Sequence, residues 1–244
     1  RMTLRRITFT CLFSFLSIAN IAMATEPLKL LYEIRDPISY RDSRGKITGL
    51  VITPTAQAMQ NAGISYVWVE TPFKRQLNVV EANDEAVCAV GMFKNKDRQK
   101  YAKFSHAIFH DTDRPSVILA HKDFQPEKSI DLLRTLSLPG IKMLKKDAAS
   151  YGTVIDDAIE RSRVAIVSTT AESLNMAKML VARRADFIFV PEDEALNMIK
   201  TIPGGEQLHI FKPLGMPQGP ERFLMCSQQV PDELIQRFNK ALIK

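Results

Sequence analysis

The chain has 244 residues, with 33 Lys+Arg against 27 Asp+Glu and a formal net charge of +6. This balance is ordinary for a soluble protein. The basic run of residues 94–103 is interrupted by Asp97, Tyr101 and Ala102, which indicates a solvated helix face. Nucleic-acid binding needs a clustered basic surface, so it is not expected.

The first residues have the pattern of a secretory signal peptide. Three Arg lie within residues 1–6, the mostly apolar run Cys11–Ala22 follows, and a small-x-small cleavage site ends at Ala24. We therefore expect residues 1–24 to be removed, so that the mature chain starts at Thr25 in the periplasm. The apolar run is short and interrupted by polar residues, which argues against a permanent membrane span. Without the three Arg, 30 basic residues face 27 acidic ones, a net charge of +3.

The cysteine and histidine positions argue against metal and disulfide scaffolds. Only Cys88 and Cys226 remain in the mature chain, too few for a disulfide framework and wrongly spaced for a metal site. His106 and His110 are four apart, but the apolar residues between them indicate a strand. We expect no metal, no cofactor and no catalytic residue.

Short apolar runs alternate with amphipathic stretches, which is the pattern of an α/β fold. About 220 mature residues favour two domains of roughly 100 each. The expected strands are Leu28–Ile34, Ser65–Val69, Val87–Gly91, Val117–His121, Ile141–Leu144, Val164–Val167, Phe187–Val190, His209–Phe211 and Phe223–Cys226. The expected helices are Pro54–Ala62, Pro72–Ala82, Lys96–Lys103, Ile130–Thr135, Tyr151–Arg161, Ala171–Arg183, Glu192–Lys200 and Pro231–Ile243.

The segment Ala86–Phe109 carries the strongest functional signal. Its apolar strand breaks at Gly91, and a polar turn then places Arg98 at the start of the next expected helix, with Phe104-Ser105 following. This pattern predicts a planar cation at the carboxyl edge of a sheet, where open α/β folds bind ligands. An ordinary strand-turn-helix with a surface Arg is the alternative.

This segment resembles the signature of the family 3 periplasmic (extracellular) solute-binding proteins, the receptors of polar amino acid ABC importers. The resemblance extends from Leu28 to Ala241 and includes residues 38–49, Ser150–Gly152 and Arg184–Phe187. It implies an α/β fold of type II, with two doubly wound lobes that are joined by two hinge strands and close on a ligand.

Two zones rich in Pro and Gly fall where the family's chain crosses between lobes. They are residues 110–115 and residues 203–220. We therefore expect the first part of lobe 1 over 25–112, lobe 2 over 113–208, and the return crossover with the rest of lobe 1 over 209–244.

The resemblance also implies binding residues. Arg98 matches the Arg that grips a ligand carboxylate through two hydrogen bonds. Gly91 matches a position where the backbone lies against the ligand, and Phe73 matches an aromatic that stacks on it. Residues Ser150, Tyr151 and Gly152 match a helix N-terminus that presents hydroxyl and amide groups to an anion. Core packing for Phe73 and simple helix capping for Ser150 are the alternatives.

The chain also departs from the amino acid receptors. Arg35 stands where they have an aromatic, Phe93 where they have Ser or Thr, and the segment Gly49–Val51 lacks their Asp. Their acceptor for the ligand ammonium maps near Pro191, next to the acidic run Glu192–Glu194, of which Glu192 is our candidate. A second Arg at the cleft edge favours a ligand more anionic than a neutral amino acid.

Three functions follow from the resemblance. The first is a monomeric receptor that delivers a small carboxylate-bearing ligand to an ABC permease. The second is a sensor subunit of the same fold that signals to a membrane kinase or chemoreceptor. The third, less favoured, is a cleft dehydratase that uses Glu192 or Asp193 beside Arg98 as an acid.

In the resembled topology, Val87–Gly91 and Phe223–Cys226 are antiparallel neighbours in one lobe. Cys88 and Cys226 are then close together. Since cross-strand geometry rarely suits a disulfide, we expect free thiols, although an oxidising compartment leaves the disulfide open.

Overall fold

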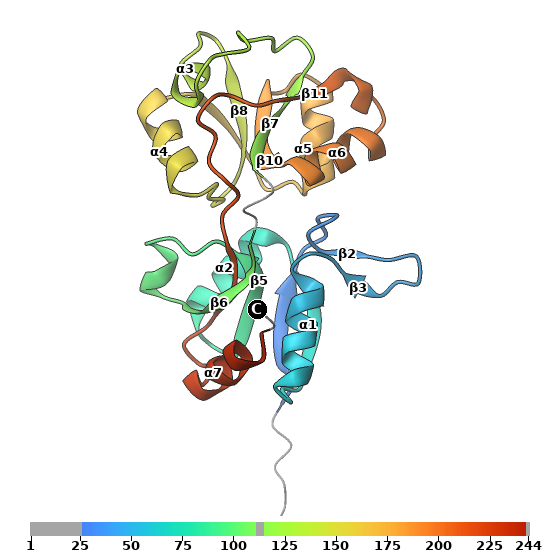
Figure 1. Ribbon diagram of the computed structural model, residues 1–244, viewed down its shortest axis with the longest axis vertical. Coiled ribbons are helices and arrows are strands. Elements are labelled where there is room, and N and C mark those ends of the chain that lie inside the picture. The colour runs from blue at the N-terminus through green and yellow to red at the C-terminus, as the bar shows by residue number, and fades with distance from the viewer. Residues whose placement is uncertain (1–25, 111–114, 243–244) are drawn as a thin grey trace, which may run out of the picture.

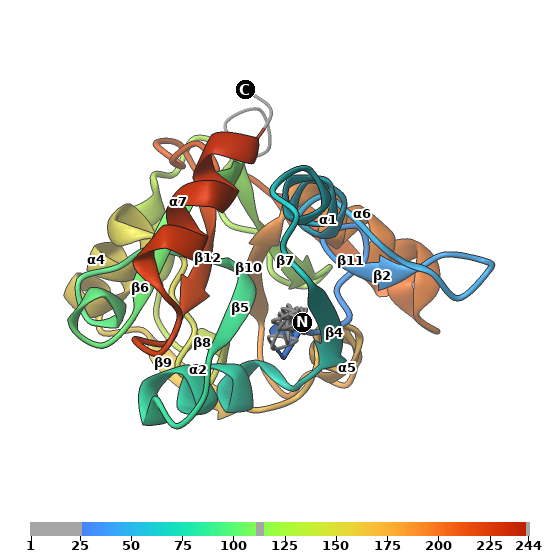
Figure 2. The same cartoon turned by 90° about the horizontal axis from the view of Figure 1, so that it is seen from below.

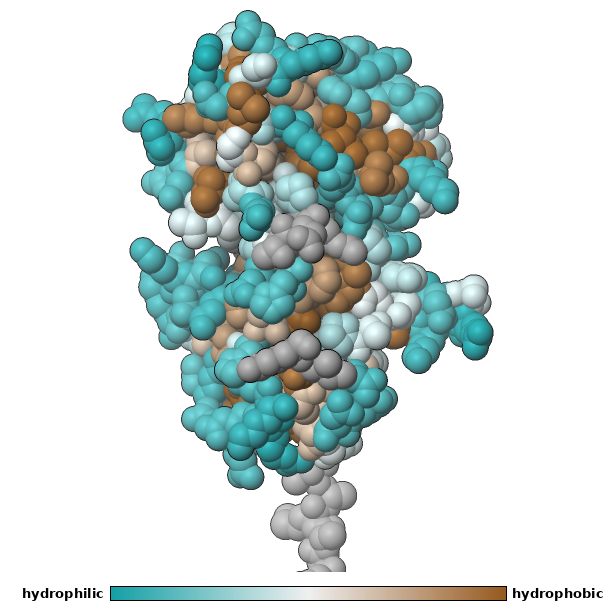
Figure 3. Space-filling view, viewed as in Figure 1, coloured by the Kyte–Doolittle hydropathy of each residue, from teal (hydrophilic) through white to brown (hydrophobic). Residues whose placement is uncertain are grey.

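The computed structural model describes residues 26–110 and 115–242, which form two α/β lobes, one above the other in Figure 1. The expected signal peptide lies outside these residues. None of the described helices combines the length and apolar content needed to span a bilayer. On the face shown in Figure 3, hydrophilic side chains cover most of both lobes, and hydrophobic patches lie on the second lobe and beside its junction with the first.

The first lobe is built on a five-stranded sheet in the order β4-β1-β5-β12-β6. Strands β4, β1 and β5 are parallel, and β12 is antiparallel to both of its neighbours. A small hairpin, β2 with β3, projects from the side of this lobe (Figure 1). The strands are β1 (Leu28–Tyr32), β2 (Tyr40–Arg41), β3 (Ile47–Thr48), β4 (Tyr66–Glu70), β5 (Val87–Met92), β6 (Lys103–Phe109) and β12 (Arg222–Cys226).

Helices cover both faces of this sheet. In Figure 2, α1 (Ile52–Asn61) and α7 (Asp232–Ala241) lie on one side and α2 (Phe73–Ala82) on the other. Each helix buries an apolar stripe: Met59 and Phe238 are fully buried in one apolar cluster with residues of β1, and Val80 is buried in a second cluster. The short 3-10 turn η1 (Arg98–Lys100) connects β5 to β6.

The second lobe has a five-stranded sheet in the order β11-β7-β10-β8-β9. Helices α3 and α4 share one apolar cluster on this sheet, and α5 and α6 share another. The strands are β7 (Ser116–His121), β8 (Lys142–Lys146), β9 (Ala165–Thr169), β10 (Phe187–Pro191) and β11 (Leu208–Phe211). The helices are α3 (Leu132–Leu136), α4 (Thr153–Ser162), α5 (Ser173–Val181) and α6 (Glu192–Thr201), with the 3-10 turn η2 (Gly205–Gln207).

The two sheets share one strand arrangement. In each, three parallel strands are followed by an antiparallel strand that enters from the other lobe: β12 in the first lobe and β7 in the second. The expected pairing of Val87–Gly91 with Phe223–Cys226 is therefore confirmed. Because β11 pairs with β7, and Leu214 then exchanges backbone hydrogen bonds with Ile130 and Leu132, the chain stays with the second lobe beyond the expected limit at 208.

The helix expected over Lys96–Lys103 is wrong. The chain forms only the 3-10 turn η1, where the Asn95 side chain accepts a hydrogen bond from the Arg98 backbone N–H at 2.9 Å. From Lys103 onward the residues pair with β12, Phe104 lying opposite Met225. Phe104-Ser105 consequently belongs to a strand, because pairing with a neighbouring strand outweighs local helix propensity.

Cys88 and Cys226 form a disulfide, contrary to the expectation of free thiols. The two residues lie directly opposite each other in the β5–β12 register, with Cα atoms 4.0 Å apart. Residues that face each other across antiparallel strands point to the same side of the sheet, so their sulfur atoms meet. The sequence could not supply this register.

Candidate functional site

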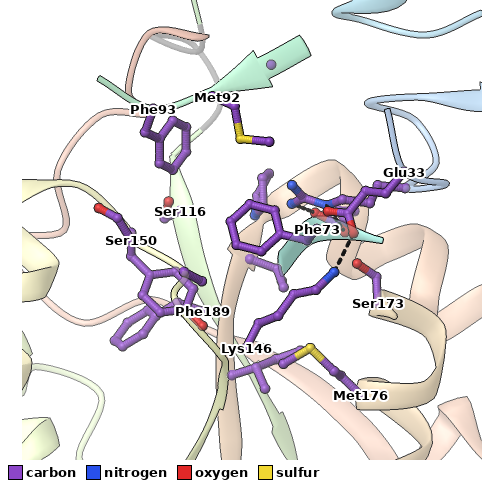
Figure 4. A pocket seen from close by; sticks show the side chains of 18 of the residues that line it. Glu33, Phe73, Met92, Phe93, Ser116, Lys146, Ser150, Ser173, Met176 and Phe189 are labelled. Atoms are coloured by element: carbon purple, nitrogen blue, oxygen red, sulfur yellow. Dashed lines mark hydrogen bonds and ion pairs between the residues drawn. The ribbon is translucent and has the colours of Figure 1, made fainter. Parts of the chain in front are cut away.

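A cavity of about 80 Å³ lies between the lobes. In the first lobe, the carboxyl ends of β1, β4 and β5 lead to Glu33 and Arg35, to Phe73, and to Arg98 respectively. In the second lobe, β8 ends at Lys146 and β10 leads to α6. This is the edge where parallel α/β sheets bind ligands, and both sheets present it to the same cavity. Figure 4 shows side chains from both lobes converging there.

Arg98 lines the cavity and bonds to backbone carbonyls. It is 5% exposed, and its guanidinium donates to the carbonyls of Phe93 at 3.0 Å and Ala148 at 3.4 Å. No carboxylate in the described ranges lies within ion-pair distance of it. Burial lowers the pKa of Arg98, with smaller opposing effects of Tyr101 and Asp156. A guanidinium has five N–H donors, so unused donors remain for a ligand.

Arg35 also lines the cavity, but a protein carboxylate occupies it. Its Nε and Nη2 donate to Glu194 at 3.1 and 2.7 Å, across the space between the lobes. The Glu194 side chain is 1% exposed and that of Arg35 is 22% exposed. Burial raises the pKa of Glu194, but the adjacent guanidinium outweighs burial and the net pKa is lowered. Glu194 is therefore ionised, and the expected role of Arg35 as a second ligand cation does not fit this geometry.

Glu33 and Lys146 form a second ion pair between the lobes (Figure 4). The Glu33 side chain is 8% exposed and that of Lys146 is 12% exposed. Lys146 also bonds Glu172 at 3.1 Å, and Arg35 Nε lies 3.7 Å from Glu33. Burial raises the pKa of Glu33 from 4.5 to about 7, although Arg35 and Lys146 act in the opposite direction.

Aromatic rings line the cavity between these charges. The Phe73 ring lies near the middle of the view in Figure 4, with Arg98 5.7 Å and Lys146 5.3 Å from its centroid. The Phe93 ring lies 4.7 Å from the guanidinium of Arg222, which also donates to the Gly91 carbonyl. Both Phe residues thus line the cavity, and both rings lie near cations.

Gly91 lines the cavity, and its backbone conformation explains why this residue is a glycine. Its φ is +80°, which side-chain-bearing residues rarely adopt, and a Cβ there would lie 3.1 Å from Val51. The glycine is required by the backbone and by packing, whether or not a ligand approaches it.

At the expected anion site, Ser150–Gly152, a carboxylate of the protein accepts the hydrogen bonds that an anion would accept. The Ser150 hydroxyl and the Tyr151 backbone N–H both donate to Asp156, at 2.5 and 2.9 Å. Tyr151 lines the cavity, where burial raises its pKa, and packs on Phe189. Gly152 precedes α4 beside Pro220 and is not in the cavity wall.

The structure places Glu192, our candidate for the acidic ligand contact, away from the cavity. Glu192 forms a partly exposed ion pair with Lys212 at 2.7 Å and does not line the cavity. Glu194 does so instead, two residues further along α6. Sequence reasoning also missed Glu33, Lys146 and Arg222, which line the cavity. Glu33 directly follows β1, Lys146 is the last residue of β8, and Arg222 is the first residue of β12. Their signal was a charged residue at a strand end, which is visible in sequence but common.

A more open cleft of about 480 Å³ adjoins the inner cavity. Glu33, Arg35 and Glu194 line both spaces, so the ion pairs stand between them. Further contacts between the lobes join Lys74 to Asp147 and Asn197 to the Asp36 carbonyl. The lobes are therefore closed on a small cavity that can hold an anion at Arg98.

Solved structures share this fold. An ancestral arginine-binding protein bound to arginine is 20% identical, with 88% of this chain and 90% of that chain covered and a TM-score of 0.69. A structure from work on glutathione import through GshT and the cystine ABC importer TcyBC of Streptococcus mutans is 16% identical, covering 88% and 87%, with a TM-score of 0.70. A histidine kinase sensor domain similar to periplasmic binding proteins is 18% identical, covering 89% of each chain, with a TM-score of 0.67.

No curated protein matches the chain. The family described as bacterial extracellular solute-binding proteins, family 3, matches residues 29–243, which is nearly all of the described structure. The repeated strand order of the two sheets agrees with that match. The chain belongs to family 3 of the bacterial extracellular solute-binding proteins.

Proposed function

We propose that this protein is an exported receptor that binds a small carboxylate-bearing ligand between its lobes and delivers it to an ABC permease. Arg98 holds the ligand carboxylate by two parallel hydrogen bonds, and Phe73 and Phe93 bound the space beside it. The proposal includes removal of residues 1–24 before the protein acts in the periplasm. Catalysis is not part of the proposal, because the family is a class of solute-binding proteins.

One observation carries the proposal. Arg98 is a buried guanidinium that lines the inter-lobe cavity and, in the described part of the chain, bonds only to carbonyl oxygens. A buried charge is costly unless it is compensated, and a carboxylate is the partner whose geometry suits a guanidinium. A ligand carboxylate would supply the missing negative charge.

Arg98→Ala tests the proposal. Small molecules that copurify with the protein are identified by mass spectrometry, and a panel of small carboxylates, amino acids included, is titrated by calorimetry. Removing the partner of a desolvated carboxylate weakens binding by roughly 2–5 kcal/mol, so the affinity for the ligand should fall tens- to thousands-fold. Arg75→Ala, an exposed position on α2, is the matched control and keeps full affinity. Equal affinity in Arg98→Ala would overturn the proposal.

A sensor is the second candidate, favoured by the similarity to a histidine kinase sensor domain. Uptake of the labelled ligand by cells with and without the protein separates the two roles. A receptor is needed for uptake, whereas a sensor changes gene expression or motility while uptake continues.

A further inference from the structure

The cavity contains two carboxylates, and both are matched by cations of the protein. Glu194 accepts two hydrogen bonds from Arg35. Glu33 is paired with Lys146 and has Arg35 within 3.7 Å. Each of the two carboxylates that line the cavity thus has a cation of the protein as its partner before any ligand enters.

A ligand ammonium group would disturb these pairs. It would be a third cation beside two buried carboxylates, in a place where like charges raise the free energy of the charged forms. A protonated Glu33 would compensate an ammonium even less. The hydroxyl of Ser150 already donates to Asp156. The described cavity wall therefore holds no carboxylate left over for an ammonium.

The rest of the wall favours an apolar ligand body. Thioether, aromatic and branched aliphatic side chains from both lobes line the same cavity as Arg98, and buried apolar surface stabilises a bound ligand in proportion to its area. These side chains are Met92, Phe93, Met176, Ile188, Phe189, Val190 and Met198.

We infer that the ligand is a small carboxylic acid with an apolar body and no ammonium group. This rests on the proposed function, because it takes Arg98 as the carboxylate partner. The ligand brings one negative charge to Arg98, its apolar part fills the space between Phe93 and the second-lobe wall, and the ion pairs stay intact.

Matched pairs of acid and amino acid test this inference. Calorimetry compares propanoate with alanine, 3-methylbutanoate with valine, and 3-phenylpropanoate with phenylalanine; the members of each pair differ only in the amino group. The tightest-binding acid should bind at least about tenfold more tightly than its amino acid, about 1.4 kcal/mol. Equal or tighter binding of the amino acids overturns the inference, as does the absence of binding by all three acids. Amino acid binding that Arg98→Ala abolishes would still uphold the proposed function.

A gain-of-binding variant tests the physical cause. Lys146→Gln removes the cation beside Glu33, so a ligand ammonium can take its place next to that carboxyl group. The affinity ratio of amino acid to acid should then rise about tenfold or more. Lys142→Gln, exposed on the same strand, is the control and leaves the ratio unchanged. An unchanged ratio in Lys146→Gln would show that the paired carboxylates do not set the selectivity, and would overturn the inference.

Discussion

The two ends of the cavity use arginine in opposite ways. Arg98 and Arg35 both follow parallel strands of the first lobe, and both line the cavity. Arg35 is neutralised by Glu194 from the opposite lobe, whereas Arg98 bonds to backbone carbonyls within the described residues. The difference shows that its position in the fold does not decide whether a cation is available to a ligand. That depends on whether a protein carboxylate lies close enough to pair with it.

The largest expected effect is the loss of stability when the ion pair between Arg35 and Glu194 is removed. Glu194→Gln leaves the guanidinium without its charged partner, which costs about 3 kcal/mol, the lower end for buried pairs, since Arg35 keeps 22% of its side chain exposed. Urea unfolding measures the loss. The double variant Arg35→Met with Glu194→Met should recover most of it, because neither charge is then left alone. Additive losses in the double variant would contradict a direct pair.

The Arg35 end should also be sensitive to pH. Burial raises the pKa of Glu33 from 4.5 to about 7, so between these values the folded protein keeps a proton that the unfolded chain has released. This contribution to stability is complete below pH 4.5 and is lost as the pH rises through about 7, a change on the order of 1–3 kcal/mol. Arg35, Lys146 and Glu172 are the charged neighbours in the described structure.

Urea unfolding of the wild type at pH 5 and pH 8 checks this prediction. Glu33→Gln should remove most of the pH difference. Glu172→Gln contacts the same lysine but is 41% exposed at its side chain, and it should leave the difference in place. A wild type equally stable at both pH values would refute the raised pKa.

The Arg98 end should depend on geometry as well as on charge. Arg98→Lys keeps a cation but loses the planar fork that forms two parallel hydrogen bonds, so affinity for the preferred carboxylate should fall about tenfold, or 1.4 kcal/mol. Calorimetry measures the change, and stability should vary less than with Glu194→Gln. Full affinity in the lysine variant would indicate a simple charge contact.

The sequence was sufficient for the α/β architecture and for placing Arg98 in the cavity wall. Apolar runs located most strands of the two large sheets but not β6 or the small hairpin of β2 and β3. The helix at Lys96–Lys103 was wrong: the chain makes only the short 3-10 turn η1 there, and strand β6 begins at Lys103, where pairing with the distant strand β12 starts. The ion pairs could not be predicted from the sequence, because their partners are far apart along the chain: Arg35 and Glu194 are 159 positions apart, and Lys146 and Glu33 are 113 apart. Their pairing exists only once both lobes face each other.

The disulfide gives the chain a covalent topology that its two-lobed outline conceals. Cys88 and Cys226 are 138 positions apart, and the whole second lobe lies between them, so this lobe is part of a closed covalent ring. Cross-linking residues so far apart removes many conformations from the unfolded chain. A protease that cuts the ring once therefore leaves a nicked but single molecule, and its two fragments separate only after reduction.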